Sequence, residues 1–222
     1  LDEKVLEQPL HWKKPRRIFV CDMTDLFHEQ IKDNWIKEVF EIMTACNGFY
    51  GDSPGRHTFQ VLTKRPERLL DFMTRWVASR GTDWIKQHGS RIWLGISVED
   101  QPTADERIPL LMRTPAALRF VSYEPALGPV DFMRHAPGFL GSHMTIDWLI
   151  IGGESGPHAR PFDLAWARSA IEQCKAAKVP VFVKQVGSYA GTMLRAGGGT
   201  WEQFPTCHPK GGAPSEWAAD LR

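Results

Sequence analysis

The sequence predicts an α/β fold, a partial (β/α) TIM-like barrel with about six parallel strands. Six apolar segments, starting near residues 18, 58, 92, 118, 147 and 180, lie 26 to 40 residues apart. Most of the intervals between them contain a segment with helical periodicity. This alternation of strand and helix is typical of a parallel sheet with right-handed crossovers. A doubly wound sheet has the same rhythm and stays open as the alternative.

The composition favours a single globular domain without a membrane span. The chain has 222 residues, of which 42% are hydrophobic and 24% charged, and its formal net charge is +1. No apolar run approaches the 18 residues of a spanning helix, and the start has no apolar signal segment. The four cysteines are far apart and form no CxxC pair, which suits a reducing cytoplasm. We expect a cytoplasmic protein.

We expect two regions along the chain. Residues 1–187 form the barrel domain, and because the first residue is Leu1 rather than methionine, this domain is expected to lack an N-terminal portion. Residues 188–222 are rich in glycine and proline and are expected to pack on the barrel as a tail.

The elements follow one another with recognisable start and stop signals. The first 17 residues are polar and end in a basic run, in which Lys13, Lys14, Arg16 and Arg17 surround a proline. Pro66 is suited to the first turn of a helix. The expected strands are 18–21, 58–64, 92–99, 118–125, 147–152 and 180–185, and the expected helices are 33–46, 66–77, 102–113 and 163–177.

Every expected strand begins apolar and finishes with an ionisable or hydrogen-bonding group. Polar side chains that converge at the carboxyl ends of parallel strands are typical of an active site on this architecture. Any strand must also leave the core through polar residues, so each position alone has a structural explanation. The groups are Asp22, Asp25, Lys64, Ser97, Glu99, Glu124, Glu154, Ser155, Lys184 and Gln185.

Glu124, Lys64 and Lys184 are the candidate catalytic residues among these groups. A carboxylate at a strand end can bind an amine or hydroxyl, coordinate a metal or act as an acid–base group. Lys184 can form a Schiff base with a carbonyl substrate. Ion pairs between the glutamates and the two lysines are the structural alternative.

Two further motifs have some resemblance to a phosphate-binding loop and to a metal site. Gly152, Gly153 and Gly156 suit the approach of a phosphate or nucleoside, but the stretch matches neither GxGxxG nor GxxxxGK[ST]. Asp25, His28 and Glu29 have loose metal-ligand spacing, although helix capping by Asp25 is the simpler explanation. We therefore expect no metal site in this chain.

Together, these stretches resemble a known family, the three-cysteine-motif proteins of phages and bacteria, whose function is unknown. The matching residues occur in the family's order and span most of the chain from residue 9 to about 187. They are residues 16–20, 25–29, 58–68, 93–101, 119–125, 128–131, 147–156, 159–161 and 182–185.

The family looks like a radical S-adenosylmethionine (SAM) barrel. The resemblance implies a 4Fe-4S cluster held by three cysteines, with SAM on the open iron. The family's cysteine cluster lies upstream of the basic run, and this sequence does not contain it. The residues expected to bind cofactor or substrate are Ser97, Glu99, Gly152, Gly153, Glu154 and Gln185.

Two other classes of function remain open. A non-catalytic phage accessory module would bind nucleic acid, a nucleotide or a phage- or host-encoded protein through the basic groups at 13–17 and 64–68. A barrel lyase or aldolase would use Lys184. The sequence identifies no substrate.

Overall fold

The computed structural model describes residues 2–47, 57–135, 146–193, 201–203, 210, 212–216 and 221. It confirms the predicted α/β fold class, with six parallel strands in the order β1-β2-β3-β4-β5-β7. A separate three-stranded sheet has the order β6-β8-β9. The chain divides into two compact units, residues 1–96 with 113–119 and residues 97–112 with 120–222. These units do not test the expected domain boundary at residue 187, which stays a prediction.

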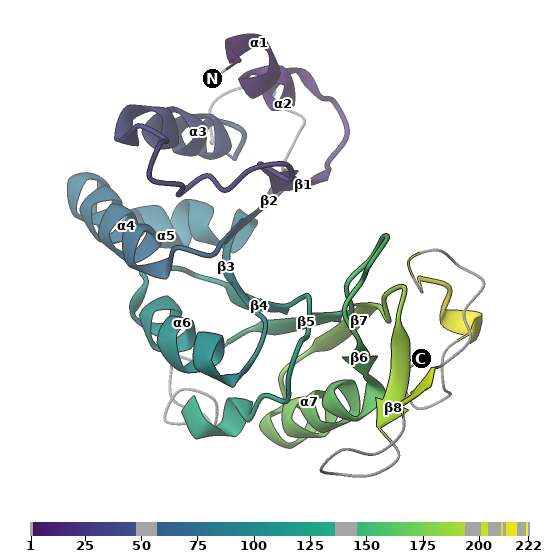
Figure 1. Cartoon of the computed structure of the whole chain (residues 1–222). Coiled ribbons are helices and arrows are strands. Elements are labelled where there is room, and N and C mark those ends of the chain that lie inside the picture. The colour runs from purple at the N-terminus through teal and green to yellow at the C-terminus, as the bar shows by residue number, and fades with distance from the viewer. Residues whose placement is uncertain are drawn as a thin grey trace. The chain divides into compact units, whose positions relative to one another are not determined.

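The first unit contains the N-terminal strands and the helices that cover them (Figure 1). β1 pairs with β2 in parallel register, from Arg17 opposite Thr58 to Val20 opposite Val61. The elements are α1 (Glu3–Leu6), α2 (Gln8–His11), β1 (Arg17–Val20), α3 (Asp33–Ala45), β2 (Thr58–Thr63), α4 (Pro66–Arg80), α5 (Asp83–His88), η1 (Gly89–Arg91) and the first five residues of β3 (Ile92–Val98).

The helices α3 and α4 confirm the predicted segments 33–46 and 66–77. Pro66 occupies the first turn of α4. Backbone N–H groups in the first turn of a helix have no intrahelical acceptor, so the missing N–H of proline costs no hydrogen bond there. Phe72 and Trp76 of α4 stack with ring centroids 5.7 Å apart, and Phe40 of α3 packs against both. All three rings are almost completely buried. This aromatic cluster forms the core between the helices of the first unit.

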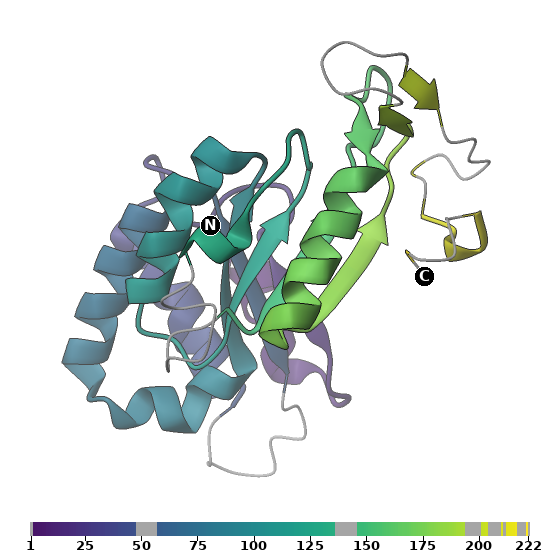
Figure 2. The same ribbon diagram turned by 90° about the horizontal axis from the view of Figure 1, so that it is seen from below.

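The second unit carries the strands whose carboxyl ends form the candidate site. β5 pairs in parallel with β4 on one side and with β7 on the other. Figure 2 shows α7 alongside β7. The elements are the end of β3, α6 (Gln101–Arg113), β4 (Arg119–Tyr123, of which Arg119 belongs to the first unit), η2 (Phe132–His135), β5 (Trp148–Gly152), β6 (Phe162–Asp163), α7 (Leu164–Ala177), β7 (Val181–Gln185), β8 (Ala190–Met193), β9 (Trp201–Gln203) and η3 (Pro214–Glu216).

Local sequence explains the start of α7. The Asp163 carboxylate accepts a hydrogen bond from the Ala165 N–H at 2.8 Å and so caps the helix. Behind the cap, a stripe of small and branched residues is buried against the sheet. It consists of Leu164, Ala167, Ala170, Ile171 and Cys174. The predicted helix 163–177 is thereby confirmed to within one residue.

Several segments differ from the expectation. The polar start contains the short helices α1 and α2, of which α1 is capped by the Asp2 carboxylate. Helix α5 was not expected, and neither were β6, β8 and β9. Strand β1 ends at Val20 rather than at Cys21, because Cys21 adopts a left-handed backbone conformation with φ 58°. Most of the expected loop 47–57 and of the tail lies outside the described residues.

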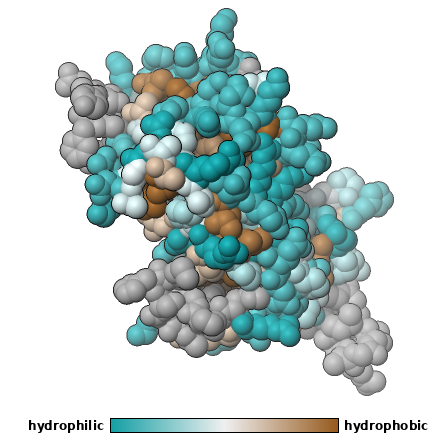
Figure 3. Space-filling model, turned by 90° about the vertical axis from the view of Figure 1, so that its left-hand side faces the viewer, coloured by the Kyte–Doolittle hydropathy of each residue, from teal (hydrophilic) through white to brown (hydrophobic). Residues whose placement is uncertain are grey.

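The visible face in Figure 3 is mostly hydrophilic, with small separate hydrophobic areas. Scattered apolar side chains are ordinary on a folded protein in water. Within the described residues, no helix is both long and apolar enough to cross a membrane.

Candidate functional site

The centre of the candidate site is an ion pair between two strand ends. Lys184 on β7 places its Nζ 3.1 Å from both carboxylate oxygens of Glu124, which directly follows β4. Gln185 donates from Nε2 to the same carboxylate at 3.1 Å. The Glu124 side chain is 19% exposed and that of Lys184 is 52% exposed. The carboxylate is therefore held inside the site, while the ammonium group stays accessible to a ligand.

Glycines make the close approach of these strands possible. A Cβ on Gly152 would lie 2.8 Å from the carboxyl carbon of Glu124. A Cβ on Gly153 would lie only 2.4 Å from the carbonyl oxygen of Val186, which is backbone and cannot swing away. The two consecutive glycines thus serve different neighbours. Gly152 leaves room for the glutamate, and Gly153 lets the loop after β5 touch the chain after β7.

Gln185 connects the ion pair to this glycine loop. Its Nε2 lies within hydrogen-bond distance of the Gly153 carbonyl, at 3.0 Å, and of the Ser155 hydroxyl, at 2.8 Å, as well as of Glu124. The Nε2 group has two N–H donors for these three oxygens, so it links the carboxylate, the backbone carbonyl and the hydroxyl in one cluster. Gln185 acts as a positioning residue whose side chain fixes the geometry of the site.

A cavity of about 380 Å³ lies over this cluster. This volume is within the range of small-molecule sites in proteins. Most of its lining residues carry charged or hydrogen-bonding side chains, so a ligand with charged groups suits it better than a purely apolar one. The lining residues are Glu124, Pro125, Gly153, Glu154, Ser155, Lys184, Gln185 and Lys210.

Glu154 has a structural role in the wall of this cavity. Arg160 donates to its two carboxylate oxygens from Nε and Nη2, each at 2.8 Å, and the Arg160 backbone N–H donates at 2.8 Å as well. These hydrogen bonds lower the pKa of Glu154 to about 2. The carboxylate is ionised at neutral pH and its oxygens are already occupied, so Glu154 is not suited to act as a general base.

Ser97 and Glu99, at the end of β3, belong to a neighbouring group in the same unit. Arg107 on α6 donates to the Glu99 carboxylate at 3.0 Å and to the Ser97 carbonyl at 2.9 Å. The segment after Glu124 connects this group to the glycine loop. The Ala126 N–H donates to the Gly152 carbonyl at 2.9 Å, and the Leu127 N–H donates to the Glu99 carbonyl at 2.8 Å.

Lys64 lies in the other compact unit, beside Asp25. The Asp25 carboxylate accepts from the Lys64 N–H at 3.0 Å, the Thr63 hydroxyl at 2.7 Å and Arg65 at 2.9 Å. Burial acts to raise the pKa of Asp25, but these hydrogen bonds and one from the Phe27 N–H outweigh it and lower the pKa. Asp25 therefore braces the end of β2. The helix-capping interpretation of this residue is wrong, because no helix follows Asp25 and the next one, α3, begins at Asp33.

Metal-binding side chains do not gather in the described part of the chain. No group of three His, Cys, Asp or Glu residues there has the geometry to hold an ion. Cys46 and Cys174 are buried, and burial raises the pKa of their thiols to about 11 and about 12. His28 accepts a backbone hydrogen bond from Gln30 through Nδ1.

The sequence reasoning missed Arg107, Arg160 and Lys210. Arg160 lies within the stretch 159–161 that contributes to the family resemblance, so its position was a usable signal. Arg107 lies on the helix that follows Glu99, and no spacing rule identifies it as the partner. Lys210 lies in the glycine-rich tail, where composition alone says nothing of contacts.

A family model described as "Protein of unknown function (DUF5131)" matches residues 1–204. No curated protein and no solved structure shows significant similarity to the chain. The family description names no activity, substrate or cofactor.

Proposed function

The chain belongs to the DUF5131 family of proteins of unknown function, and we propose that the pocket at the ends of β4, β5 and β7 binds SAM as a cofactor of a radical-SAM-like enzyme. The observation that carries the proposal is the Glu124–Lys184 ion pair in the lining of this cavity. SAM contains an α-amino-acid group, which presents an ammonium and a carboxylate side by side. Glu124 binds the ammonium and Lys184 the carboxylate, so the ligand replaces one ion pair by two.

The remaining groups of the pocket fit this assignment. Gln185 holds the Glu124 carboxylate in position, and the Gly153 carbonyl offers a further acceptor for an ammonium group. The cavity of about 380 Å³ is suited to a small molecule. Glu154, in its ion pair with Arg160, shapes the wall and takes no proton.

The iron–sulfur cluster that the resemblance implies does not fit the described residues. Three thiolates must surround such a cluster, and the described residues offer no such group. Cys46 and Cys174 are buried in the helical layer rather than at the strand ends. We therefore assign no cluster ligand and no catalytic step to this chain, and the proposal concerns binding by its own residues.

Isothermal titration calorimetry with SAM tests the proposal. We expect saturable binding that is weakened about tenfold or more by Glu124→Gln and by Lys184→Met, because each variant removes one charge-assisted interaction. Free methionine should compete, since it carries the same amino-acid group, whereas adenosine alone should compete poorly. Ser90→Ala, in the other compact unit, is a matched surface control that should leave the affinity unchanged.

Absence of SAM binding, or equal affinity in the wild type and both variants, would disprove the assignment. Anaerobic reconstitution with iron and sulfide, done on a protein that includes the upstream segment expected to carry the three cysteines, addresses the enzymatic part separately. A brown, iron-containing protein that cleaves SAM supports it, whereas a colourless protein that still binds SAM leaves a binding domain without the chemistry.

A further inference from the structure

A second polar cavity, of about 490 Å³, lies among three helices of the first unit. Its walls come from the end of α3, the last residues of α4 and most of α5, and α4 and α5 lie side by side (Figure 1). All of the lining residues except Trp84 have polar side chains. The cavity shares no lining residue with the pocket at the ends of β4, β5 and β7.

The hydroxyl groups of this cavity already donate their protons to helix carbonyls. Thr44 donates from Oγ1 to the Phe40 carbonyl at 2.7 Å, and Ser79 donates from Oγ to the Trp76 carbonyl at 2.7 Å. The Trp84 Nε1–H donates to the Thr44 hydroxyl at 3.2 Å. Because a hydroxyl oxygen has lone pairs as well as a proton, both hydroxyls keep acceptor capacity. A ligand of this cavity must therefore supply donors to them.

Arg80 and Gln87 supply donors to the same cavity. Arg80 uses Nη2 for the Glu41 carboxylate, and its guanidinium lies 4.2 Å from the Trp76 ring centroid. A guanidinium has several further N–H groups that stay available for a ligand. Gln87 is exposed and lines the cavity with an amide that both donates and accepts. The cavity thus presents donors and acceptors together.

His88 contributes a nitrogen without a partner. Its Nδ1 is buried and makes no hydrogen bond within the described residues. Burial, and to a smaller extent the charge of Arg80, lowers the pKa of His88, so the ring is mostly neutral at pH 7. A buried polar atom without a partner costs free energy in the folded protein. A ligand that provides this partner recovers that cost.

The charges around the cavity disfavour an ionic ligand. Each charged side chain of the lining has a partner of opposite sign, since Arg80 pairs with Glu41 and Asp83 pairs with Lys86. The carboxyl ends of α3 and α4, with the partial negative charge of a helix C-terminus, also lie at this cavity. An anion would meet these helix ends, and a cation would meet the Arg80 guanidinium. A neutral ligand avoids both.

The aromatic residue of the lining offers little surface for stacking. Trp84 is only 6% exposed and packs edge-on against Trp76, with ring centroids 5.8 Å apart. A flat aromatic ligand therefore gains little from its ring. Hydroxyl groups are neutral and both donate and accept, which an oxyanion and an ammonium ion do not.

We propose that this cavity binds a neutral polyhydroxylated ligand of monosaccharide size. Hydroxyl groups of the ligand donate to Thr44 and Ser79 and accept from Arg80 and Gln87. A turn of the His88 ring about its Cβ–Cγ bond brings Nδ1 to the cavity, where another hydroxyl becomes its partner. The volume is within the range of small-molecule sites. The proposal is independent of SAM binding, because the two cavities lie in different units.

NMR titration with neutral sugars tests this proposal. The probes are glucose, galactose, mannose, fructose and ribose, and the reporters are the backbone N–H signals of α5 and the indole N–H of Trp84. We expect at least one sugar to shift these signals saturably, with a Kd in the millimolar range, because each hydrogen bond to a neutral ligand adds little net affinity. Tetrahydropyran, a sugar ring without hydroxyl groups, should leave the signals unchanged. Inorganic phosphate is the anionic control and should also leave them unchanged.

Two variants separate recognition from folding. His88→Phe removes the unpaired nitrogen, so it should weaken sugar binding about fivefold without lowering the melting temperature. Gln87→Leu removes an exposed amide of the lining and should weaken binding by a similar factor. Glu38→Gln, at an exposed position of α3 outside the lining, is the matched control and should leave the Kd unchanged. If His88→Phe does not fold, Gln87→Leu carries the test.

Three results overturn the proposal. The first is that no sugar of the panel shifts the reporter signals. The second is that tetrahydropyran or phosphate shifts them as strongly as the sugars do, which assigns the cavity to an apolar or an anionic ligand. The third is a sugar whose Kd is the same in the wild type and in every folded variant of the lining.

Discussion

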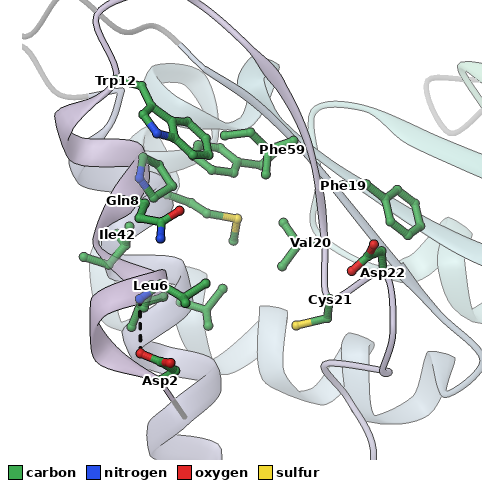
Figure 4. A pocket seen from close by; sticks show the side chains of 15 residues that line it. Asp2, Leu6, Gln8, Trp12, Phe19, Val20, Cys21, Asp22, Ile42 and Phe59 are labelled. Carbon is green, nitrogen blue, oxygen red and sulfur yellow. Dashed lines mark hydrogen bonds between the residues drawn. The ribbon is translucent and has the colours of Figure 1, made fainter.

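Two pockets in the described part of the molecule differ in the chemistry of their walls and in how far their polar groups are already paired. In the strand-end pocket, Glu124 is already paired with Lys184 and Gln185, and the glycine backbone is packed without spare room. In the pocket beside β1 (Figure 4), apolar side chains make up most of the walls, and β1 pairs only with β2 among the described residues. A ligand of the first pocket must exchange partners with existing groups, whereas a ligand of the second adds new ones. The first pocket is therefore expected to be rigid and sensitive to small changes, and the second tolerant.

The largest effect is expected at Gly153. Gly153→Ala places a methyl group 2.4 Å from the Val186 carbonyl, so the backbone must move, and we expect a loss of about 3 kcal/mol in unfolding free energy. The matched control is Gly156→Ala, three residues on, where nothing lies within 4 Å of the added carbon but φ is +105°. Backbone strain alone should cost about 1 kcal/mol there. Urea denaturation measures both, and equal losses would contradict the packing argument.

Substitutions at two valines compare the packing of β1 with that of the adjacent strand β2. Val20 and Val61 are register partners on β1 and β2. Val61 is 1% exposed, whereas Val20 is partly exposed beside the cavity. We expect Val61→Ala to cost about 2 kcal/mol and Val20→Ala less than about 1 kcal/mol, since less surface is buried and no enclosed void forms. Similar costs in urea denaturation would mean that β1 is as well packed as its neighbour.

A smaller change is expected at Gly152. The three atoms nearest to its added methyl group all belong to the Glu124 side chain, which can rotate, so Gly152→Ala should cost about 1 kcal/mol. The displaced carboxylate leaves Lys184, so SAM binding should weaken although the fold persists. Calorimetry on Gly152→Ala and Gly156→Ala compares the two effects. Unchanged SAM affinity in Gly152→Ala would separate Glu124 from the ligand.

The smallest effect concerns the exposed pair of Glu154 and Arg160. Because the pKa of Glu154 is lowered from 4.5 to about 2, the pair stabilises the fold fully above about pH 4.5 and loses this contribution as the pH falls toward 2. Arg160→Gln should return the pKa of Glu154 toward 4.5, as followed by carboxyl NMR titration. The same variant should also make the free energy of unfolding depend less on pH between about pH 2 and pH 4.5. A pKa that stays near 2 would mean that the backbone N–H, and not the guanidinium, sets it.

The regular part of the fold was predictable because its physical signals are local. Buried parallel strands are continuous apolar runs, and the helices carry apolar stripes of the right period. The helices α1 and α2 have four residues each and bury none of them, so they leave no periodic pattern. The strands β6 and β9, with two and three residues, are too short for a sequence signal.

The candidate site was predictable in its composition but not in its pairings. Polar residues at strand ends identified Glu124, Lys184 and Gln185, because adjacent parallel strands bring their ends together. Whether Glu124 or Glu154 pairs with Lys184 depends on the loop after β5, which turns Glu154 toward Arg160. Lys64 follows the same pattern yet lies in the other unit. The position of a residue at the end of a strand therefore predicts the edge of the sheet at which its side chain lies, but not the side chain with which it pairs.

The consecutive backbone N–H groups of Ala126 and Leu127 donate hydrogen bonds to carbonyl groups at the ends of β5 and β3, so the motions of these two strand ends are coupled. Any displacement that frees Glu124 from its strand end pulls on both hydrogen bonds at once, so the Gly152 and Glu99 carbonyls lose their donors together. Hydrogen exchange at these two amides should consequently show one common opening rate rather than two. A ligand that steadies Glu124 should slow exchange at both amides, which gives a reporter of occupancy that needs no label on the ligand.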